Sequence, residues 1–245
     1  MATHPTPDQE HALVCEFFGG ETSGYFVEVG ANHPTEGSQT WHLEQAGWIG
    51  VLVEPQPDLA AFLVTSRKAR VFANACSSPD TAGQSLPLHV DGPRSALDRD
   101  RMSPGAKAAY VIVVPTRTLD SILEEAEAPA PIDLLSIDVE GHETEVLRGF
   151  NFSRWQPLLI LVEDHVNSLQ THRYLTRSGY RLIRRLGHNG WYVASRRGRD
   201  GFVVPALGNS AQTLPCAAVL CGAQCRAPGA AALRRLVGGT LECRD

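Results

Sequence analysis

Residues 24–54, GYFVEVGANHPTEGSQTWHLEQAGWIGVLVE, decide the fold. The stretch opens with a short apolar run that ends at a glycine and continues with helical character over 38–46. It closes with a second apolar run over 49–53. Short runs of β-branched and aromatic residues bounded by Gly or Pro are typical of buried strands, and a helix between two of them indicates a parallel crossover. The stretch therefore predicts a strand–helix–strand unit.

The same alternation continues along the chain to about residue 198. It predicts an α/β domain, residues 1–198, in which a largely parallel sheet is covered by helices on both faces. The last two strands, over 180–185 and 191–194, are close enough in sequence to form an antiparallel pair. Further strands are expected over 71–75, 86–90, 110–114, 132–137 and 158–162, and helices over 1–22, 58–66, 119–126, 143–148 and 170–177.

Two regions depart from this alternation. Residues 86–127 form a longer excursion between strands of the sheet, and insertions of this length often serve as lids or acceptor-binding elements. A purely structural hairpin is the alternative. Residues 199–245 are rich in Ala, Gly and Cys, which predicts a poorly ordered or loosely docked appendage. Its cysteines lack the closely spaced pairs of most zinc sites, so a zinc site is not favoured at Cys216, Cys221, Cys225 and Cys243.

The composition excludes several classes of protein. The chain has 245 residues, of which 43% are hydrophobic and 20% charged, so it can bury a sizeable core and is not mainly disordered. Its net charge of −5 disfavours a protein that binds nucleic acid by neutralising phosphates. It shows no apolar run of membrane-spanning length and no secretion signal. We therefore expect a cytoplasmic protein that binds neither nucleic acid nor membranes.

Residues that follow the first three predicted strands suit an adenosine ligand, because ligands bind beyond the carboxyl ends of parallel strands. Gly30 lets the backbone approach a ligand closely. Glu54 ends the second strand, where a carboxylate accepts hydrogen bonds from both hydroxyls of a ribose. The first loop lacks the second glycine of the dinucleotide fingerprint, so the ligand's head is not expected to be a pyrophosphate. The candidate cofactor residues after these strands are Glu28, Gly30, Asn32, Glu54, Cys76 and Ser77, and Asp138 after the fourth strand of the sheet is a further candidate.

Ionisable residues gather after the fourth and fifth strands of the predicted sheet. Like charges so close raise some pKa values, or they require a cation or a base as partner. A single cluster of this kind is often a helix cap. Two clusters at neighbouring strand ends would face one cleft, which favours a functional site. The residues are Asp138, Glu140 and His142 after one strand, and Glu163, Asp164 and His165 after the next.

Several segments, taken in order, make residues 24–194 resemble the FkbM family of S-adenosylmethionine-dependent methyltransferases. These segments include FVEVGAN, SQTWHLEQAGWIGVLVEPQP, NACSS, VPTRTLDSIL, IDLLSIDVEGHETEVLRGF and LVEDH. The resemblance implies a Rossmann-like class I sheet of seven strands whose last strand is antiparallel. It also implies methylation of a hydroxyl on a sugar, polyketide or other natural-product acceptor.

The same resemblance implies roles for individual residues. The loop carrying Glu28, Gly30 and Asn32 resembles the part that holds the methionine end of the cofactor. Glu54 resembles the family's residue that binds the ribose of the cofactor. Asp138 and Glu140 resemble the family's acidic motif beside the methyl donor.

Methylation of a hydroxyl needs a base, and a histidine serves at neutral pH. The candidates are His165, which directly follows a strand end, and His142. Alternatively, Mg²⁺ held by Asp138, Glu163 and Asp164 would acidify the hydroxyl, although oxygen ligands alone do not select a metal, so Mg²⁺ is not favoured. Two other classes stay open, an NAD- or sugar-nucleotide-dependent enzyme on a similar sheet and a non-catalytic adenosylmethionine-fold module.

Overall fold

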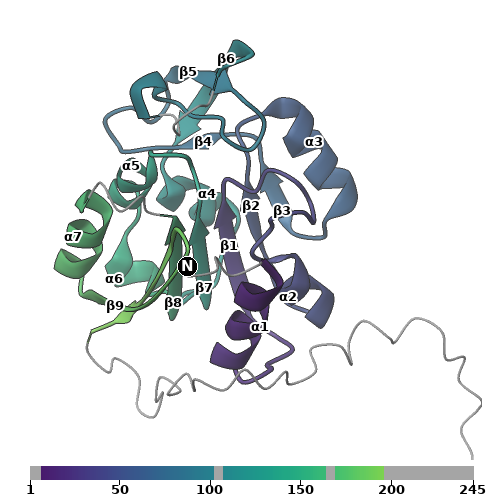
Figure 1. Cartoon of the computed structure of the whole chain (residues 1–245), viewed down its shortest axis with the longest axis vertical. Coiled ribbons are helices and arrows are strands. Elements are labelled where there is room, and N and C mark those ends of the chain that lie inside the picture. The colour runs from purple at the N-terminus through teal and green to yellow at the C-terminus, as the bar shows by residue number, and fades with distance from the viewer. Residues whose placement is uncertain (1–6, 102–106, 164–168, 196–245) are drawn as a thin grey trace, which may run out of the picture. The chain divides into compact units, whose positions relative to one another are not determined.

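A computed structural model describes residues 7–101, 107–163 and 169–195 (Figure 1). The appendage expected over 199–245 lies outside these residues. The helices are α1 (Pro7–Phe17), α2 (Trp41–Ala46), α3 (Pro57–Ser66), the 3₁₀ helix η1 (Arg99–Arg101), α4 (Leu119–Glu125), α5 (Glu143–Arg148), α6 (Phe152–Trp155) and α7 (Gln170–Arg177). The strands are β1 (Tyr25–Val29), β2 (Ile49–Val53), β3 (Arg70–Phe72), β4 (Ala75–Cys76), β5 (Ser85–Val90), β6 (Tyr110–Arg117), β7 (Leu134–Ile137), β8 (Leu159–Glu163), β9 (Tyr180–Leu186) and β10 (Asn189–Ala194).

The main sheet has seven strands in the order β3-β2-β1-β7-β8-β10-β9. From β3 to β8 all neighbours are parallel. β10 lies between β8 and β9 and is antiparallel to both. The chain builds outward from β1 to β3 and then returns to the other side of β1, so the strand order reverses between β1 and β7. This is the expected Rossmann-like arrangement, and such a reversal opens a crevice at the carboxyl ends of the strands.

Each face of the main sheet carries its own apolar core. Side chains alternate along a strand, so Phe26 packs into one core while Val27 and Val29 pack into the other. Helices α4 to α7 contribute to the core that contains Val27, whereas α1 to α3 contribute to the core that contains Phe26 (Figure 1). Strands β1 and β7 are buried along their whole length, which explains their nearly continuous apolar sequences.

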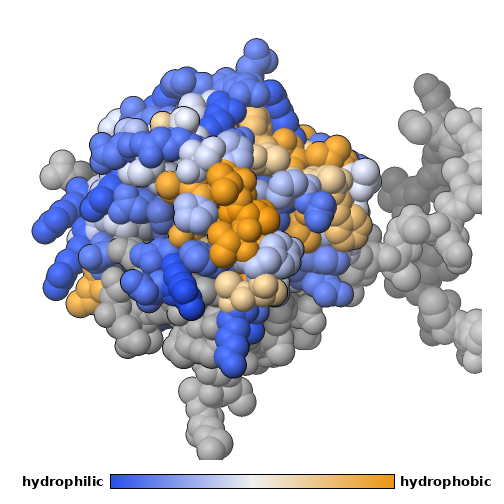
Figure 2. All heavy atoms as spheres, turned by 90° about the horizontal axis from the view of Figure 1, so that it is seen from above, coloured by the Kyte–Doolittle hydropathy of each residue, from blue (hydrophilic) through white to orange (hydrophobic). Residues whose placement is uncertain are grey.

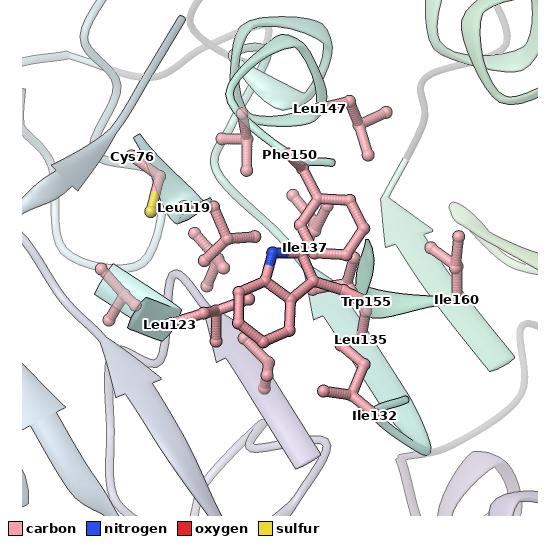
Figure 3. Close-up of a cluster of buried hydrophobic side chains, with 14 of the residues drawn as sticks. Cys76, Leu119, Leu123, Ile132, Leu135, Ile137, Leu147, Phe150, Trp155 and Ile160 are labelled. Carbon is pink, nitrogen blue, oxygen red and sulfur yellow. The ribbon is translucent and has the colours of Figure 1, made fainter. Parts of the chain in front are cut away.

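Trp155 fills the centre of the core beneath α4 and α5. It lies among Leu119, Leu123 and Leu135 (Figure 3) and is 1% exposed. Its indole Nε1 donates a hydrogen bond of 2.8 Å to Asp120 Oδ1 at the start of α4. The short helix α6, which the sequence pattern did not predict, therefore ties the strand β8 to α4.

Trp155→Phe should lower the free energy of unfolding by about 1–2 kcal/mol, because it removes this hydrogen bond and leaves a small void. Chemical denaturation followed by circular dichroism measures the change. Trp41→Phe is the matched control, since Trp41 is partly exposed at the start of α2. An equal loss in both variants would argue against the role of the Asp120 contact.

A second sheet of three strands, β4-β6-β5, accounts for the long excursion. The single strand expected over 71–75 is wrong. The main-sheet strand ends at Phe72, and the chain then pairs Ala75 and Cys76 with Thr116 and Arg117 of β6. The last part of the expected 86–127 excursion, α4, packs into the core of the main sheet instead. The inserted element is therefore the small sheet and its loops.

Apolar residues gather on the face that carries the small sheet when the protein is seen from above (Figure 2). Among the exposed large apolar side chains, Val111 and Val113 belong to β6, and Phe62 and Val64 belong to α3. The exposure of Val111 and Val113 follows from the period-two alternation of β6, whose Val114 is fully buried. No helix in the described residues is long and apolar enough to cross a membrane.

Helix α1 is attached to the sheet through Glu10, a buried carboxylate. Glu10 accepts hydrogen bonds from Asn189 Nδ2 at 2.7 Å, Trp191 Nε1 at 2.9 Å and Gln39 Nε2 at 3.1 Å. These donors come from β10 and from the loop that follows β1. Glu10 therefore connects the N-terminal helix both to the antiparallel end of the sheet and to the loop that follows β1.

His42 of α2 stacks on His11 of α1, with ring centroids 4.5 Å apart. Both ring nitrogens of His42 are buried and have no hydrogen-bond partner among the described residues. Burial, followed by the nearby charges of His11 and Arg67, lowers the pKa of His42 to about 3. His42 is therefore a packing residue between α1 and α2.

This environment predicts that the protein loses stability in mild acid. The unfolded chain takes up a proton on His42 below pH about 6.5, whereas the folded protein resists protonation, so stability falls as pH drops below that value. The expected contribution is about 1 kcal/mol per pH unit. His42→Phe should flatten the dependence of unfolding free energy on pH between 7 and 5, measured by denaturant titration, whereas His89→Gln should not. Identical slopes in all three proteins would contradict this account.

Candidate functional site

A cleft lies at the carboxyl ends of β1, β2 and β7, where the strand order reverses. Its lining encloses about 550 Å³ of empty space, a figure that includes open solvent. Gly30 and Asn32 line it after β1, Glu54 after β2, and Asp138 and Glu140 after β7. The structure therefore brings together candidate residues that the sequence placed at three separate strand ends.

Glu54 is held in one orientation by the backbone around it. The amide of Asn32 donates to Glu54 Oε2 at 2.8 Å, and the amide of Gln56 donates to Glu54 Oε1 at 2.9 Å. The residue is 3% exposed. Burial raises the pKa of Glu54, and the two amide hydrogen bonds oppose this shift because they favour the ionised form. Each oxygen of the Glu54 carboxylate keeps a second lone pair, which can accept a hydrogen bond from a ligand.

Gly30 allows the first loop to turn against the end of β7. Its φ of +84° is in the left-handed region, and a Cβ there would lie 1.7 Å from the carbonyl oxygen of Asp138. The amides of Gly30 and Ala31 both donate to the carbonyl oxygen of Val53, at 2.9 and 3.1 Å. Only glycine permits this approach, so the loop and the acidic segment share one wall of the cleft.

Glu28 shapes the first loop from behind and is not among the residues that line the cleft. Its carboxylate accepts hydrogen bonds from Ser38 Oγ at 2.9 Å, Gln39 N at 2.7 Å and Thr40 Oγ1 at 2.5 Å. These bonds explain why α2 begins only at Trp41, although helical character was expected from residue 38. The carboxylate is positioned to hold the loop, and the cofactor contact expected for Glu28 from the sequence stays a prediction.

The acidic segment after β7 turns sharply into α5. Glu140 has a φ of +51° and Gly141 has a φ of +96°, and the amide of Gly141 donates to Glu143 Oε1 at 2.8 Å. A left-handed conformation at a non-glycine residue costs free energy and is often found at functional sites. This turn directs Glu140 and His142, the residue before α5, into the lining of the cleft.

Asp138, Glu140 and Glu163 form a carboxylate cluster in which one oxygen from each lies within 4.8 Å of the others. Loss of surrounding water raises the pKa of Asp138, and the charges of Glu163, Glu140 and Glu28 raise it further. The Asp138 side chain remains open to solvent, so we attribute more of this shift to the neighbouring carboxylates than to burial. Asp138 and Glu163 also share a hydrogen bond, and burial raises the pKa of Glu163. The pair thus tends to retain one proton.

The second oxygen of Glu163, Oε2, is buried without a hydrogen-bond partner in the described part of the chain. A buried carboxylate oxygen of this kind suits a cationic or N–H donor group from a ligand. Two members of the predicted Mg²⁺ site, Asp138 and Glu163, do lie together, and Glu140 joins them. Asp164, the third predicted member, and His165, the first candidate base, lie outside the described residues.

The remaining predicted residues follow β4. Cys76 lines the cleft, and burial raises the pKa of its thiol to about 12, so it is an uncharged apolar contact. Ser77 is buried beside the cleft and does not line it, although its Oγ lies 2.9 Å from His142 Nε2. His142 itself lines the cleft, so one of the two candidate bases is within the site.

The small sheet contributes a wall that sequence reasoning did not assign to the cofactor. Leu88 of β5 and Leu97 of the following loop line the cleft together with Ala75 and Cys76. Gln56 Nε2, beside Glu54, donates to Ser95 Oγ of that loop at 3.4 Å. The excursion therefore closes the cleft on the side of Glu54. Only its length and position in the sequence indicated that it had any role at a binding site.

Comparison with known families assigns the chain to a family. The Methyltransferase FkbM domain matches residues 28–182, which include Glu28, Glu54 and the acidic segment after β7. The chain belongs to the FkbM methyltransferase family. It is therefore an S-adenosylmethionine-dependent methyltransferase with a Rossmann-like fold. No curated protein sequence matches the chain.

Solved structures with a similar fold include other methyltransferases. The chain is similar to a TehB-like SAM-dependent methyltransferase from Corynebacterium glutamicum, with 9% identity and a TM-score of 0.37 over 76% of this chain and 85% of that one. It is also similar to TrmK from M. capricolum in complex with S-adenosylhomocysteine, with 9% identity and a TM-score of 0.38 over 78% of this chain and 68% of that one. The assignment of this chain to the FkbM methyltransferase family rests on the family match over residues 28–182 and not on these distant structural similarities.

Proposed function

We propose that this FkbM methyltransferase transfers the methyl group of S-adenosylmethionine to a hydroxyl of a small acceptor, such as a sugar, a polyketide or another natural product. The observation that carries the proposal is the buried carboxylate of Glu54, fixed by two backbone amides and directed at the cleft. A carboxylate at this strand end is suited to a ribose diol. No pyrophosphate-binding glycine pattern lies nearby.

The residues in the cleft fit the two ends of this cofactor. At the Glu54 end, Leu88, Leu97 and Cys76 supply an apolar wall for an adenine ring. At the other end, Asp138, Glu140 and the unpartnered oxygen of Glu163 supply negative charge for a sulfonium and an ammonium group. Gly30 and Asn32 lie between these ends. When bound, the cofactor supplies an electrophilic methyl group whose sulfur is a good leaving group.

The chain's own residues must then align the acceptor, exclude water and remove a proton. His142 is the candidate base within the described cleft, and His165 remains a candidate outside it. A Mg²⁺ ion at Asp138, Glu140 and Glu163 is the alternative means of acidifying the hydroxyl. Treatment with EDTA distinguishes the two mechanisms, because only the Mg²⁺-dependent mechanism would lose turnover when the chelator removes the ion.

Calorimetry followed by an acceptor screen tests the proposal. We expect S-adenosylmethionine and S-adenosylhomocysteine to bind, and NAD and nucleoside-diphosphate sugars not to bind. S-adenosylhomocysteine should then accumulate when a panel of hydroxylated sugars and polyketides is supplied, but not when matched acceptors with methylated hydroxyls are supplied. Cofactor binding without product on any acceptor would favour a non-catalytic module, and binding of NAD in place of the cofactor would overturn the assignment.

A further inference from the structure

One edge of the small sheet is open along most of β6. β5 pairs with residues 110–115 of this strand, whereas β4 reaches only Thr116 and Arg117. Among the described residues, 110–114 therefore have a neighbouring strand on one side alone. Unpaired backbone groups along such an edge can form hydrogen bonds with a strand from another chain.

The hydrogen bonds at the end of β6 show which residues face the open side. The amide of Thr116 donates at 2.9 Å to the residue before β5, and the carbonyl oxygen of Arg117 accepts at 2.9 Å from the residue after β4. Successive residues of a strand direct their backbone groups to opposite sides, and the register with β5 has no shift. Val111 and Val113 are in phase with Arg117. Their amides and carbonyls therefore point away from β5, where the described part of the chain supplies no hydrogen-bond partner.

The outer face of the small sheet is apolar beside this edge. The side chains of Val111 and Val113 are 52% and 70% exposed, on the face seen from above in Figure 2. Pro87 of β5 lies opposite Val113 and is also exposed. Residues 85–90 and 110–116 contain no Asp, Glu, Lys or Arg. The open edge is thus bordered by an exposed surface without charge, which is typical of an interaction site.

Both edges of the main sheet, in contrast, are protected. β3 has three residues, one of which is Arg70, and β9 contains three arginines. Short length and charge hinder pairing with a second chain. On the small sheet, the outer side of β5 is bridged at His89 by Ala96. β6 has only Pro115, which lacks an amide and ends the open stretch next to β4.

We propose that the open edge of β6 pairs antiparallel with the same edge of a second copy of this chain, about a two-fold axis next to Ile112. This symmetry places Val111 of one copy opposite Val113 of the other, and both residues direct their amides and carbonyls to the open side. Each of the two valine pairs then exchanges both N–H···O bonds, as hydrogen-bonded pairs of an antiparallel sheet do. The two small sheets thereby join into one continuous sheet.

A second copy fits this edge because the edge is complementary to itself. A two-fold interface brings the same patch of both copies together. The outer face carries no charge near the axis, so no like charges meet there. The side chains of Val111 and Val113 would lie next to each other as cross-strand pairs, which stabilise antiparallel sheets. A partner selected by charge, in contrast, finds no charged residue to bind on these strands. The pairing is independent of the proposed methyl transfer.

Val113→Pro tests the pairing, because it removes an amide that faces the open side and none that faces β5. Pro115 is in the same phase of the strand, which shows that β6 accommodates proline at such positions. We expect the full-length wild-type chain to form dimers at micromolar concentrations. The dissociation constant of the dimer should rise by about 30- to 100-fold in the variant, since each copy loses one hydrogen bond and the proline ring obstructs its edge. Sedimentation equilibrium measures both proteins.

Two lysine variants separate the β6 edge from the general apolarity of the surface. Val113→Lys introduces like charges near the axis and should raise the dissociation constant by about tenfold or more, and it decides the question if Val113→Pro does not fold. Val64→Lys changes a side chain of α3 that is 62% exposed and should leave the dissociation constant unchanged. Circular dichroism checks that each variant is folded. A monomeric wild type, unchanged dimers in the folded Val113 variants, or equal weakening by Val64→Lys would overturn the proposal.

Disulfide formation tests the register of the two strands. Hydrogen-bonded antiparallel pairs have Cα atoms about 5.5 Å apart, which suits a disulfide. An equimolar mixture of Val111→Cys and Val113→Cys chains should therefore form a covalent dimer on mild oxidation. Either variant alone should not, because like positions lie diagonally, about 7–8 Å apart. The wild type reports linkage through its own cysteines, and mass spectrometry identifies the joined peptides. Linkage of Val111→Cys to itself, with none in the mixture between positions 111 and 113, would contradict the proposed register.

Discussion

Glu54→Ala is expected to weaken S-adenosylmethionine binding by about 1.5–3 kcal/mol, or roughly 10- to 100-fold in Kd, because it removes charged hydrogen bonds to the ribose. The carboxylate is 3% exposed and already oriented by the amides of Asn32 and Gln56. Little conformational freedom is therefore lost when the diol binds, and the full value of those bonds appears in the affinity. Calorimetric titration measures the change.

Controls for this experiment separate the ribose contact from loss of loop structure and loss of charge. Glu54→Gln retains the shape and one acceptor oxygen, so it should weaken binding less than alanine does. Asp58→Asn makes the same change of charge on the exposed side of α3, near the cleft, and should have little effect. S-adenosylhomocysteine shares the ribose and should lose affinity to a similar extent. Unchanged affinity in Glu54→Ala would remove Glu54 from the binding site.

Arg67→Met should lower the free energy of unfolding by about 3–5 kcal/mol, the largest effect expected on stability. The Arg67 side chain is fully buried and lies 3.1 Å from Glu44, which is also buried. Its guanidinium also donates to the carbonyl oxygen of Pro34, to Ser38 Oγ and to Thr40 Oγ1. Arg67 thus compensates the charge of Glu44 and holds the loop that Glu28 holds from the other side.

The cost comes from the carboxylates that methionine would leave behind. Glu44 would lose its cation inside the protein, and the positive charge that helps to keep Glu28 ionised would be removed. Arg67→Met combined with Glu44→Leu should recover part of the loss, because no uncompensated charge then remains at that position. Arg70→Met is the matched control, since Arg70 pairs with Glu125 on the surface and should cost less than about 1 kcal/mol. Urea denaturation of the four proteins tests this, and equal losses for Arg67→Met and Arg70→Met would contradict it.

The sequence was most informative where strands end. Glu54 and Asp138 each follow an apolar run, so the pattern of residues alone predicts their place at one edge of the sheet. Gly30 could also be identified, because a glycine directly after a buried strand marks a close approach of backbones. Local pattern and topology together determine these positions.

Features that depend on distant contacts could not be predicted in this way. Arg67 follows α3 and has the appearance of a surface residue in the sequence, yet its partner Glu44 lies on another helix. The strand expected over 71–75 divides because Ala75 and Cys76 find a partner in β6, far along the chain. Leu88 and Leu97 reach the cleft only once the small sheet has folded. The hydrogen bonds that Glu28 accepts from Ser38 and Thr40 also depend on the folded loop.

A crystal structure of the protein with S-adenosylhomocysteine tests the central claim most directly. The ribose hydroxyls should lie within hydrogen-bond distance of the Glu54 carboxylate, about 2.6–3.0 Å, with the adenine against Leu88 and Leu97 and the sulfur on the side of Asp138. If the ribose lay away from Glu54, or the ligand bound outside the cleft between β1, β2 and β7, the account of this site would be wrong.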